Sequence, residues 1–355
     1  IKMTTLEADL REFAGSFPLY NELQGRTVMV TGATGLLGSL TVRCLLALRE
    51  KYELDLKIVA VVRNLSKAKA MLGEETAALS YLVYDFAGGD ASGLLASATG
   101  EAAVQPQPRM LILHFAAPTT SRFFVDRPVE TIRTVISGTE AVLRYAQATG
   151  ATMVLASSLE VYGAVHDASA PLSETAQGYL DPMATRSSYP MAKRAAETLC
   201  HCYAAEYGTH ARVARLAQTF GAGVQKDDSR VFADFTRHIV DSTDIVLHTT
   251  GTLSRSYCYT TDAIAAMLTI ALRGTDGEAY NVAADGSYIS IADMAALLCR
   301  RFGHGSQVVV ELKEGMGYSE PTLLNLSTEK LKALSWQARI PLEEMFRRLI
   351  ASFKE

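Results

Sequence analysis

Residues 28–38 read Val28-Met29-Val30-Thr31-Gly32-Ala33-Thr34-Gly35-Leu36-Leu37-Gly38, and the fold can be predicted from this stretch. Its apolar, β-branched beginning predicts a buried strand, and the amphipathic residues from 36 to about 49 predict a helix. Gly32 permits a tight turn, Gly35 lets the backbone approach a pyrophosphate, and Gly38 lets the helix pack closely on the strand. A strand, this turn and a helix in that order predict a dinucleotide-binding unit with the phosphates at the helix N-terminus.

Four more apolar runs follow, at 57–62, 80–84, 110–115 and 152–156, and segments of helical periodicity lie between them. Strands that alternate with helices predict an α/β fold with a doubly wound parallel sheet. In such a sheet the ligand binds at the carboxyl ends of the strands. We therefore expect the residues that close the five strands to form the rim of a cofactor site: Gly32, Arg63, Asp85, Ala116 and Ser157.

The residues with the clearest catalytic chemistry follow the fifth strand. Ser158 stands at the strand end, and Tyr189 and Lys193 stand four positions apart in a helical segment that runs to about residue 207. Positions i and i+4 share a helix face, so the phenol and the ammonium project the same way. We expect this ammonium, together with an oxidised nicotinamide, to lower the pKa of Tyr189 so that it acts as a base near neutral pH. Ser158 is expected to hydrogen-bond the same substrate hydroxyl.

These motifs resemble those of the extended short-chain dehydrogenases/reductases, and in particular the NAD-dependent epimerase/dehydratase family, which modifies nucleotide sugars. The resemblance rests on TGATGLLG at 31–38, HFAA at 114–117, SSLEVYG at 157–163, YPMAK at 189–193 and RSYCYTTD at 255–262. It covers nearly all of the chain from about residue 25. It implies a Rossmann domain followed by a smaller C-terminal α/β substrate lobe.

The expected domain organisation has three parts. Residues 1–24 are predicted to form an N-terminal helical cap, and residues 25–220 the Rossmann domain, from which the loop 164–187 faces the substrate. Residues 221–355 are expected to form mainly the substrate lobe, with 257–283 returning to the Rossmann domain.

Within the family, the chain is most similar to the UDP-glucuronate decarboxylases. The run at 155–163 resembles their strand-five motif, with Glu160 at the position of their glutamate, and DDSRV at 227–231 resembles a loop of theirs. The resemblance implies transient oxidation at C4 of the sugar by the catalytic residues Ser158, Glu160, Tyr189 and Lys193. It implies substrate contacts from Thr119, Ser158, Gln218, Arg230 and Arg255.

Other functions remain open at this point. In hexose 4,6-dehydratases an aspartate stands where this chain has Leu159, and it protonates the departing hydroxyl, which leucine cannot do. A 4-epimerase usually carries no acid at the position of Glu160, and an NADP-dependent reductase releases reduced cofactor in each turn. Outside the enzymes, a dinucleotide-sensing regulator usually lacks the Tyr189 and Lys193 pair that is present here.

The cofactor implied by the resemblance is NAD. Its contacts are expected from the glycine turn, the strand ends and the catalytic helix, namely Gly32, Thr34, Gly35, Leu36, Leu37, Gly38, Arg63, Asn64, Asp85, Phe86, Ala116, Ala117, Tyr189 and Lys193. Arg63 is unusual, because NAD-selective relatives end the second strand with an acidic residue that binds the ribose hydroxyls. A guanidinium suits a 2′-phosphate, with Ser66 or Lys67 assisting, so NADP is the alternative cofactor.

Composition excludes several classes of partner. The chain has 355 residues and a formal net charge of −4, and a mildly acidic chain without basic clusters predicts no nucleic-acid partner. No apolar run is long enough to span a bilayer and no signal-peptide pattern is present, so a cytoplasmic protein without a membrane partner is expected. The five cysteines lack metal-ligand spacing, so no metal site is predicted.

A homodimer is the assembly that the resemblance implies. In the family, the segments corresponding to 128–149 and 189–207 pair across a two-fold axis as a four-helix bundle. The apolar residues expected to supply its seam are Val135, Val142, Leu143, Leu199 and Tyr203.

Overall fold

The computed structural model describes residues 3–88, 93–94, 106–107, 109–313 and 322–355, so residues 1–2 of the predicted cap lie outside it. Its central sheet has seven parallel strands in the order β11-β6-β5-β4-β1-β2-β3. These are β1 (Arg26–Thr31), β2 (Leu56–Val62), β3 (Leu79–Val83), β4 (Met110–His114), β5 (Thr152–Ser158), β6 (Ala211–Leu216) and β11 (Ala279–Val282). The strand order reverses at β1, which lies between β2 and β4. The predicted doubly wound α/β fold is confirmed.

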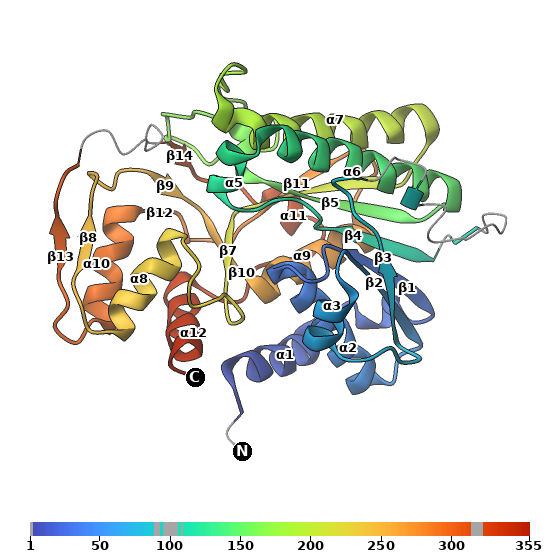
Figure 1. Ribbon diagram of the computed structural model, residues 1–355, viewed down its shortest axis with the longest axis horizontal. Coiled ribbons are helices and arrows are strands. Elements are labelled where there is room, and N and C mark those ends of the chain that lie inside the picture. Colours follow the sequence, from blue (N-terminus) through green and yellow to red (C-terminus); the bar gives the residue numbers. More distant parts are fainter. Residues whose placement is uncertain (1–2, 89–92, 95–105, 108, 314–321) are drawn as a thin grey trace.

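Two layers of helices cover the sheet (Figure 1). One face carries α2 (Leu36–Tyr52), α3 (Leu65–Leu72) and α9 (Thr260–Arg273), and the other carries α5 (Ser121–Asp126), α6 (Pro128–Thr149) and α7 (Ser188–Tyr207). Each layer buries its own apolar cluster against the sheet. Helix α6 has Pro128 in its first turn and is followed by Gly150, whose φ is 73°, as the preferences of helix ends predict.

A smaller lobe lies beside the sheet (Figure 1). It contains α8 (Val231–Val240), α10 (Ile291–Phe302) and α12 (Leu342–Lys354), with the short strands β8 (Ile245–Leu247), β9 (Ser254–Arg255), β12 (Ile289–Ser290), β13 (Val308–Val310) and β14 (Leu323–Leu324). Its core is a cluster of aromatic and aliphatic side chains, in which Phe220 stacks on Phe232 with ring centroids 4.7 Å apart. The short helix α11 (Glu329–Lys332) packs against β11.

The segment 257–283 divides between the two parts of the molecule. Strand β11 joins the edge of the central sheet, and α9 packs against β4, β5 and β6. Strand β10 (Tyr257–Tyr259) pairs instead with β7 (Gln218–Phe220) in a separate two-stranded sheet. This pair connects the central sheet to the smaller lobe.

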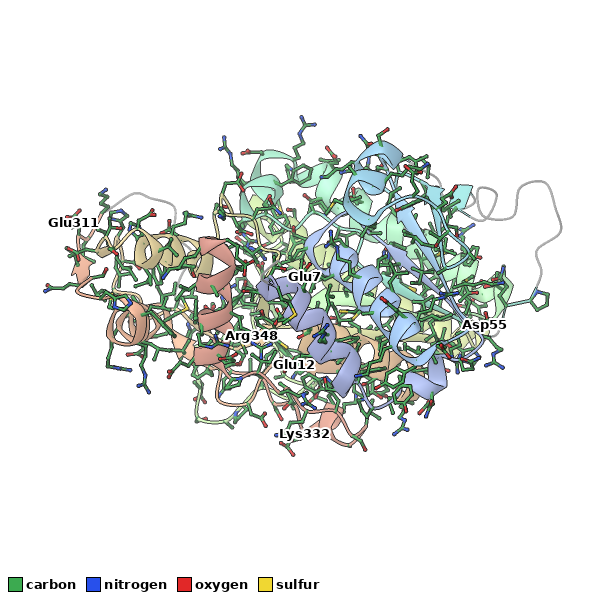
Figure 2. The ribbon with its side chains drawn as sticks, turned by 90° about the horizontal axis from the view of Figure 1, so that it is seen from below. Glu7, Glu12, Asp55, Glu311, Lys332 and Arg348 are labelled. Atoms are coloured by element: carbon green, nitrogen blue, oxygen red, sulfur yellow. The ribbon has the colours of Figure 1, made fainter. Side chains whose placement is uncertain are left out.

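The N-terminal segment consists of α1 (Thr5–Ser16) and the 3₁₀ helix η1 (Tyr20–Leu23). Helix α1 opens with a capping box, in which the Thr4 side chain accepts from the Glu7 backbone N–H and the Glu7 carboxylate accepts from Thr4. Figure 2 shows α1 lying between α2 and α12, and α1 contacts both helices. The first helix of the chain therefore contacts the last one.

Three of the five residues assigned to a dimer seam lie inside the subunit. Val135, Val142 and Leu143 are at most 1% exposed and belong to the cluster between α6 and the central sheet. That part of the seam prediction is wrong, because the apolar stripe of a helix does not distinguish a sheet of the same chain from a second copy. The large hydrophobic residues of α6 and α7 that are exposed are Val129, Ile132, Met191 and Tyr207. The dimer itself stays a prediction.

Among the described residues, no helix combines the length and the apolar character that crossing a membrane requires.

Candidate active site

A cavity of about 950 Å³ opens at the carboxyl ends of β1, β2, β4 and β5. It reaches from the glycine turn after β1 to Arg230 and Arg255 in the smaller lobe. Ligand sites in proteins commonly measure about 300–1,000 Å³, so this volume has room for a large or compound ligand. Every predicted catalytic, cofactor and substrate residue lines the cavity except Asn64. The roles assigned to these residues stay predictions.

The glycine turn packs too tightly for side chains at two of its positions. Gly32 has φ of 64°, and a Cβ there would lie 3.0 Å from the backbone of Ala116. A Cβ on Gly38 would lie within 2.2 Å of the Gly32 carbonyl oxygen. Helix α2 begins after Gly35 without a side-chain cap among the described residues. Leu36, Leu37 and Gly38 line the cavity, so this helix N-terminus, with its uncapped N–H groups, lies beside the space in which an anion can bind.

The end of β2 carries positive charge where NAD-selective proteins carry a carboxylate. Arg63 and Lys67 both line the cavity, and so does Asp85 after β3. The Asn64 side chain instead accepts a hydrogen bond from the Lys67 backbone N–H at 2.9 Å and so caps α3. The Asn64 side chain therefore has a structural role, and the charged groups of this part of the cavity are Arg63, Lys67 and Asp85.

A buried hydrogen-bonded pair fixes the strand ends beside the glycine turn. Thr31 Oγ1 lies 2.7 Å from His114 Nδ1, and it accepts a hydrogen bond from the Ala116 backbone N–H. Burial and the nearby charge of Lys193 lower the pKa of His114 to about 3. His114 is thus neutral at physiological pH, and it joins β1 to β4 without adding charge to the cavity.

Helix α7 and the end of β5 bring the predicted catalytic groups together. Tyr189 and Ser158 both line the cavity, and the Ser158 hydroxyl is among the groups that lower the pKa of Tyr189. Lys193 Nζ donates to the carbonyl oxygen of Ala156 at 2.7 Å and lies 5.8 Å from the centroid of the Tyr189 ring. Tyr189 and Lys193 are both buried in the protein and both line the cavity. A phenol, a hydroxyl and an ammonium thus share one wall.

The lowering of the Tyr189 pKa expected from Lys193 and an oxidised nicotinamide stays a prediction, because the groups of the chain alone raise this pKa. Burial raises the pKa of Tyr189, the charge of Glu160 raises it further, and the hydrogen bond with Ser158 and the charge of Arg186 only partly oppose this. Burial also lowers the pKa of Lys193, to about 8. A base at position 189 therefore needs the additional positive charge of a ligand bound next to it.

A partly buried ion pair lies next to Lys193, with its acid on the same helix. Glu197 stands one helical turn after Lys193, and its charge opposes the lowering of the lysine pKa. Its carboxylate lies 2.7 Å from the guanidinium of Arg215 and accepts a hydrogen bond from the Ser157 hydroxyl. The bonds from Arg215 and Ser157 hold Glu197 and tie α7 to β5 and β6 beneath the reacting groups.

Glu160 lies in the 3₁₀ helix η2 (Leu159–Tyr162), directly after β5. Its carboxylate pairs with Arg186, with a nitrogen-to-oxygen distance of 3.0 Å, and both side chains line the cavity. Leu159, the residue before it, is 1% exposed and belongs to the apolar core. The acid of this wall is therefore at position 160, and position 159 offers none.

The smaller lobe contributes two arginines to the cavity. Arg230 is held by its neighbour Asp228, whose carboxylate lies 2.6 Å from the guanidinium. Arg255 is the last residue of β9, and the backbone of this strand pairs with β12 and β14. Its Nε is buried and has no hydrogen-bond partner among the described residues. A buried donor without a partner is costly, so Arg255 is available to a ligand that enters the cavity.

The lining of the cavity is cationic although the chain is acidic overall. The basic residues of the lining are Arg63, Lys67, Arg122, Arg186, Lys193, Arg230 and Arg255, and the acidic ones are Asp85, Glu130 and Glu160. Such an excess of positive charge in a cleft attracts anionic ligands. No cluster of three or more metal-ligating side chains occurs among the residues that the structure describes.

A sequence profile of the NAD-dependent epimerase/dehydratase family matches residues 28–283, which is most of the chain. The chain belongs to this family. The predicted family and enzyme class are thereby confirmed, and NAD is the cofactor that the family takes.

Individual members of the family are similar to the chain over part or all of its length. UDP-glucuronic acid decarboxylase 1 of Xenopus tropicalis is 29% identical over 246 residues, which are 69% of this chain and 56% of that protein. UDP-glucuronic acid decarboxylase 3 of Arabidopsis thaliana is 32% identical over 182 residues, 51% of this chain and 52% of that protein. The matched region thus spans about half the length of these curated relatives.

A solved structure of the same fold is UDP-glucose 4-epimerase of Thermotoga maritima. It has a TM-score of 0.75 with this chain at 20% identity, and the match covers 92% of this chain and 98% of that one. At this level of identity the likeness is one of fold.

Two residues that contact the predicted catalytic groups were missed by the sequence analysis. Arg186 stands three positions before Tyr189, in the 3₁₀ helix η3 (Thr185–Ser187), and no residue pattern marks it as a partner of Glu160. Phe124 stacks on the Tyr189 ring with centroids 4.1 Å apart. The sequence holds one indication for Phe124, which is that it follows the fourth strand, because the segments after the strands of such sheets contact ligands.

Proposed function

We propose that this protein decarboxylates a UDP-activated uronic acid by transient oxidation at C4 of the sugar. The observation that carries the proposal is Glu160, an acid on the same cavity wall as Ser158 and Tyr189. The neighbouring position, where a dehydratase needs its acid, is the buried Leu159. The similarity to UDP-glucuronic acid decarboxylases supports the same substrate class.

The cavity fits a nicotinamide dinucleotide on the evidence of its own residues. The space beside Gly32 and Gly38 excludes a Cβ, and the uncapped N-terminus of α2 offers N–H groups to a pyrophosphate. Arg63 and Lys67 are available to the adenosine ribose or to a 2′-phosphate, which keeps NADP as an alternative. When bound, the oxidised cofactor supplies a reversible hydride acceptor.

The residues of the chain then have separate tasks. Tyr189 takes the proton of the C4 hydroxyl, Ser158 orients that hydroxyl, and Lys193 provides positive charge behind the phenol. A ketone at C4 makes the sugar a β-keto acid, which loses CO₂ readily. The enolate that loss of CO₂ leaves takes up one proton from solvent at C5, and the Glu160 carboxylate, paired with Arg186, can accept a hydrogen bond from the water that delivers it. Arg255 and Arg230 are proposed to hold the diphosphate, because paired guanidinium donors suit phosphate oxygens.

A panel of nucleotide sugars, read by mass spectrometry and NMR, tests the proposed function. The panel contains UDP-glucuronate, UDP-glucose, UDP-N-acetylglucosamine and dTDP-glucose. We expect loss of CO₂ from UDP-glucuronate and no net change in the free cofactor. Loss of water would indicate a dehydratase, an unchanged mass with a new stereoisomer would indicate a 4-epimerase, and a change of two hydrogens would indicate a net oxidoreductase. Any of these three results would overturn the decarboxylase proposal.

The Arg255→Ala variant should have a kcat/KM for the nucleotide sugar at least about tenfold lower than the wild type, roughly 1.4 kcal/mol. The reason is that a buried Nε without a partner is placed to meet the substrate, so its loss weakens binding while dinucleotide affinity and Tm change little. Arg301→Ala is the matched control, since Arg301 lies in the same lobe in an exposed pair with Glu343. Unaltered kinetics of Arg255→Ala would remove the diphosphate contact from the proposal.

A homodimer also stays our proposal. The exposed apolar residues Val129, Ile132, Met191 and Tyr207 on α6 and α7 support it.

A further inference from the structure

Glu160 and Arg186 form an ion pair that connects the two segments carrying the catalytic groups. Glu160 follows the end of β5 in η2, and Arg186 precedes α7 in η3. A terminal nitrogen of the guanidinium lies 3.1 Å from one oxygen of Glu160 and 3.0 Å from the other. The two side chains are 16% and 33% exposed, so the pair is only partly open to solvent. Salt therefore screens it less than it screens a surface pair.

A second contact fixes Arg186 relative to Tyr189. The guanidinium carbon of Arg186 lies 5.0 Å from the centroid of the Phe124 ring, within the range of a cation–π interaction. Phe124 is buried and stacks nearly parallel on the ring of Tyr189. The carbonyl oxygen of Phe124 also accepts a hydrogen bond from the Ser188 hydroxyl. Arg186, Phe124 and Tyr189 therefore form one packed unit, which the ion pair joins to Glu160.

Several other charges on the elements around Tyr189 have partners elsewhere, and Arg194 on α7 donates to the backbone carbonyl oxygens of Val161 and Gly178. On α5, Arg122 pairs with Asp126, and on α6, Glu130 pairs with Arg127. On β6, Arg215 pairs with Glu197 and Arg212 pairs with Asp276. Further along α6, Arg144 pairs with Glu140.

The charges that act on Tyr189 are those of the Glu160–Arg186 pair, and the ammonium of Lys193 lies 5.8 Å from the ring centroid. Burial is the main cause that raises the pKa of Tyr189, and the charge of Glu160 adds to it. The hydrogen bond with Ser158 and the charge of Arg186 lower it.

We propose that Arg186 is a positioning residue, which holds the Glu160 carboxylate on the cavity wall and balances its charge next to Tyr189. The balance allows a carboxylate and a tyrosine base to work in one site, since an unpaired carboxylate opposes formation of the phenolate. The part played by Glu160 in turnover rests on the proposed function. The charge balance between Arg186 and Glu160 does not depend on the proposed function, because it can be measured without a sugar substrate.

The test is a pH titration of Tyr189 by NMR in protein labelled with ¹³C at the tyrosine Cζ, with NAD⁺ present. The Tyr189 resonance is identified by its absence from Tyr189→Phe. Arg186→Gln should raise the pKa of Tyr189 by about one unit, the lower end of the shift that one nearby charge causes. Glu160→Gln should lower this pKa, and the double variant should titrate near the wild type. Arg186→Lys should restore most of the wild-type value, because it keeps the charge.

Arg122→Gln is the matched control, since Arg122 lines the same cavity but its side chain is 91% exposed and pairs with Asp126. It should leave the titration unchanged. In turnover, Arg186→Gln should move the acid limb of the kcat/KM profile to higher pH by the same amount, with little change in KM at the optimum.

The outcomes separate the proposal from the proposed function. An unshifted Tyr189 titration in Arg186→Gln together with a tenfold higher KM would make Arg186 a substrate-binding residue and overturn the proposal. Shifted titrations in a protein that turns over none of the nucleotide sugars would support the charge balance and reject the proposed function. Equal titrations in Arg186→Lys and Arg186→Gln would contradict a role for charge.

Discussion

The Tyr189→Phe variant should turn over its nucleotide sugar at least about a hundredfold more slowly than the wild type, because losing a general base commonly costs about 10²–10⁴ in rate. The substitution removes only the phenolic hydroxyl of Tyr189, a residue that lines the cavity together with Ser158. The ring that stacks on Phe124 is kept, and so is the Lys193 ammonium with its bond to Ala156. The fold and the affinity for NAD should therefore change little. Steady-state kinetics, NAD titration by calorimetry and thermal unfolding measure these three properties.

Tyr179→Phe is the matched control for the loss of a phenolic hydroxyl, since Tyr179 is 69% exposed and does not line the cavity. Its kinetics should equal those of the wild type. If Tyr189→Phe kept more than about a tenth of the wild-type rate, the loss would be smaller than removal of a general base produces. Another group of the cavity wall would then have to act as the base.

The position of the site could be predicted because it follows from topology. Once the strands are assigned to a parallel sheet, their carboxyl ends share one edge, and Gly32, Arg63, Asp85, Ala116 and Ser157 all line the cavity there. The i, i+4 spacing likewise placed Tyr189 and Lys193 on one face of α7. Asn64 failed to join them because an asparagine before a helix has a strong competing use as its N-cap.

Properties that depend on burial or on distant partners could not be read from the sequence. The pKa of Tyr189 is raised mainly by burial, which a motif does not report. The pair of Glu160 and Arg186 joins residues from two different 3₁₀ helices, and only the return of the loop 164–187 brings them together. The apolar stripe of α6 predicted a packed face correctly, but Val135 and Val142 show that its partner is the sheet.

The contact between the first and last helices has a charged centre. Arg348 on α12 lies 2.8 Å from Asp9 and 2.8 Å from Glu12 on α1, and it also pairs with Glu344. Figure 2 shows Arg348 and Glu12 where α12 and α1 lie side by side. Asp9 is 2% exposed and accepts a further hydrogen bond from the Tyr259 hydroxyl of β10. The cluster therefore joins the N-terminal helix, the smaller lobe and the strand pair between the two parts of the molecule.

The Arg348→Met variant should lower the free energy of unfolding by about 3–5 kcal/mol at pH 7, as is typical when one partner of a buried ion pair is removed. Methionine keeps most of the apolar stem but leaves the Asp9 carboxylate buried without its guanidinium. Urea unfolding, followed by circular dichroism, measures the loss. The matched control is Arg347→Met on the same helix, because Arg347 is 60% exposed and pairs only with Glu344 among the described acids. It should cost less than about 1 kcal/mol.

The pH dependence of this loss identifies its origin. Burial raises the pKa of Asp9 above its ordinary value of 3.8, and the hydrogen bond from Tyr259 and the charge of Arg348 partly oppose this. Without Arg348, the pKa of Asp9 in the folded chain rises further, while the unfolded value stays the same. The folded variant then binds a proton more tightly than the unfolded one, so its stability recovers as the pH falls through the raised pKa. The deficit relative to the wild type should shrink between pH 7 and pH 5. An equal deficit at both values would attribute the lost stability to packing of the arginine stem and not to an uncompensated buried charge.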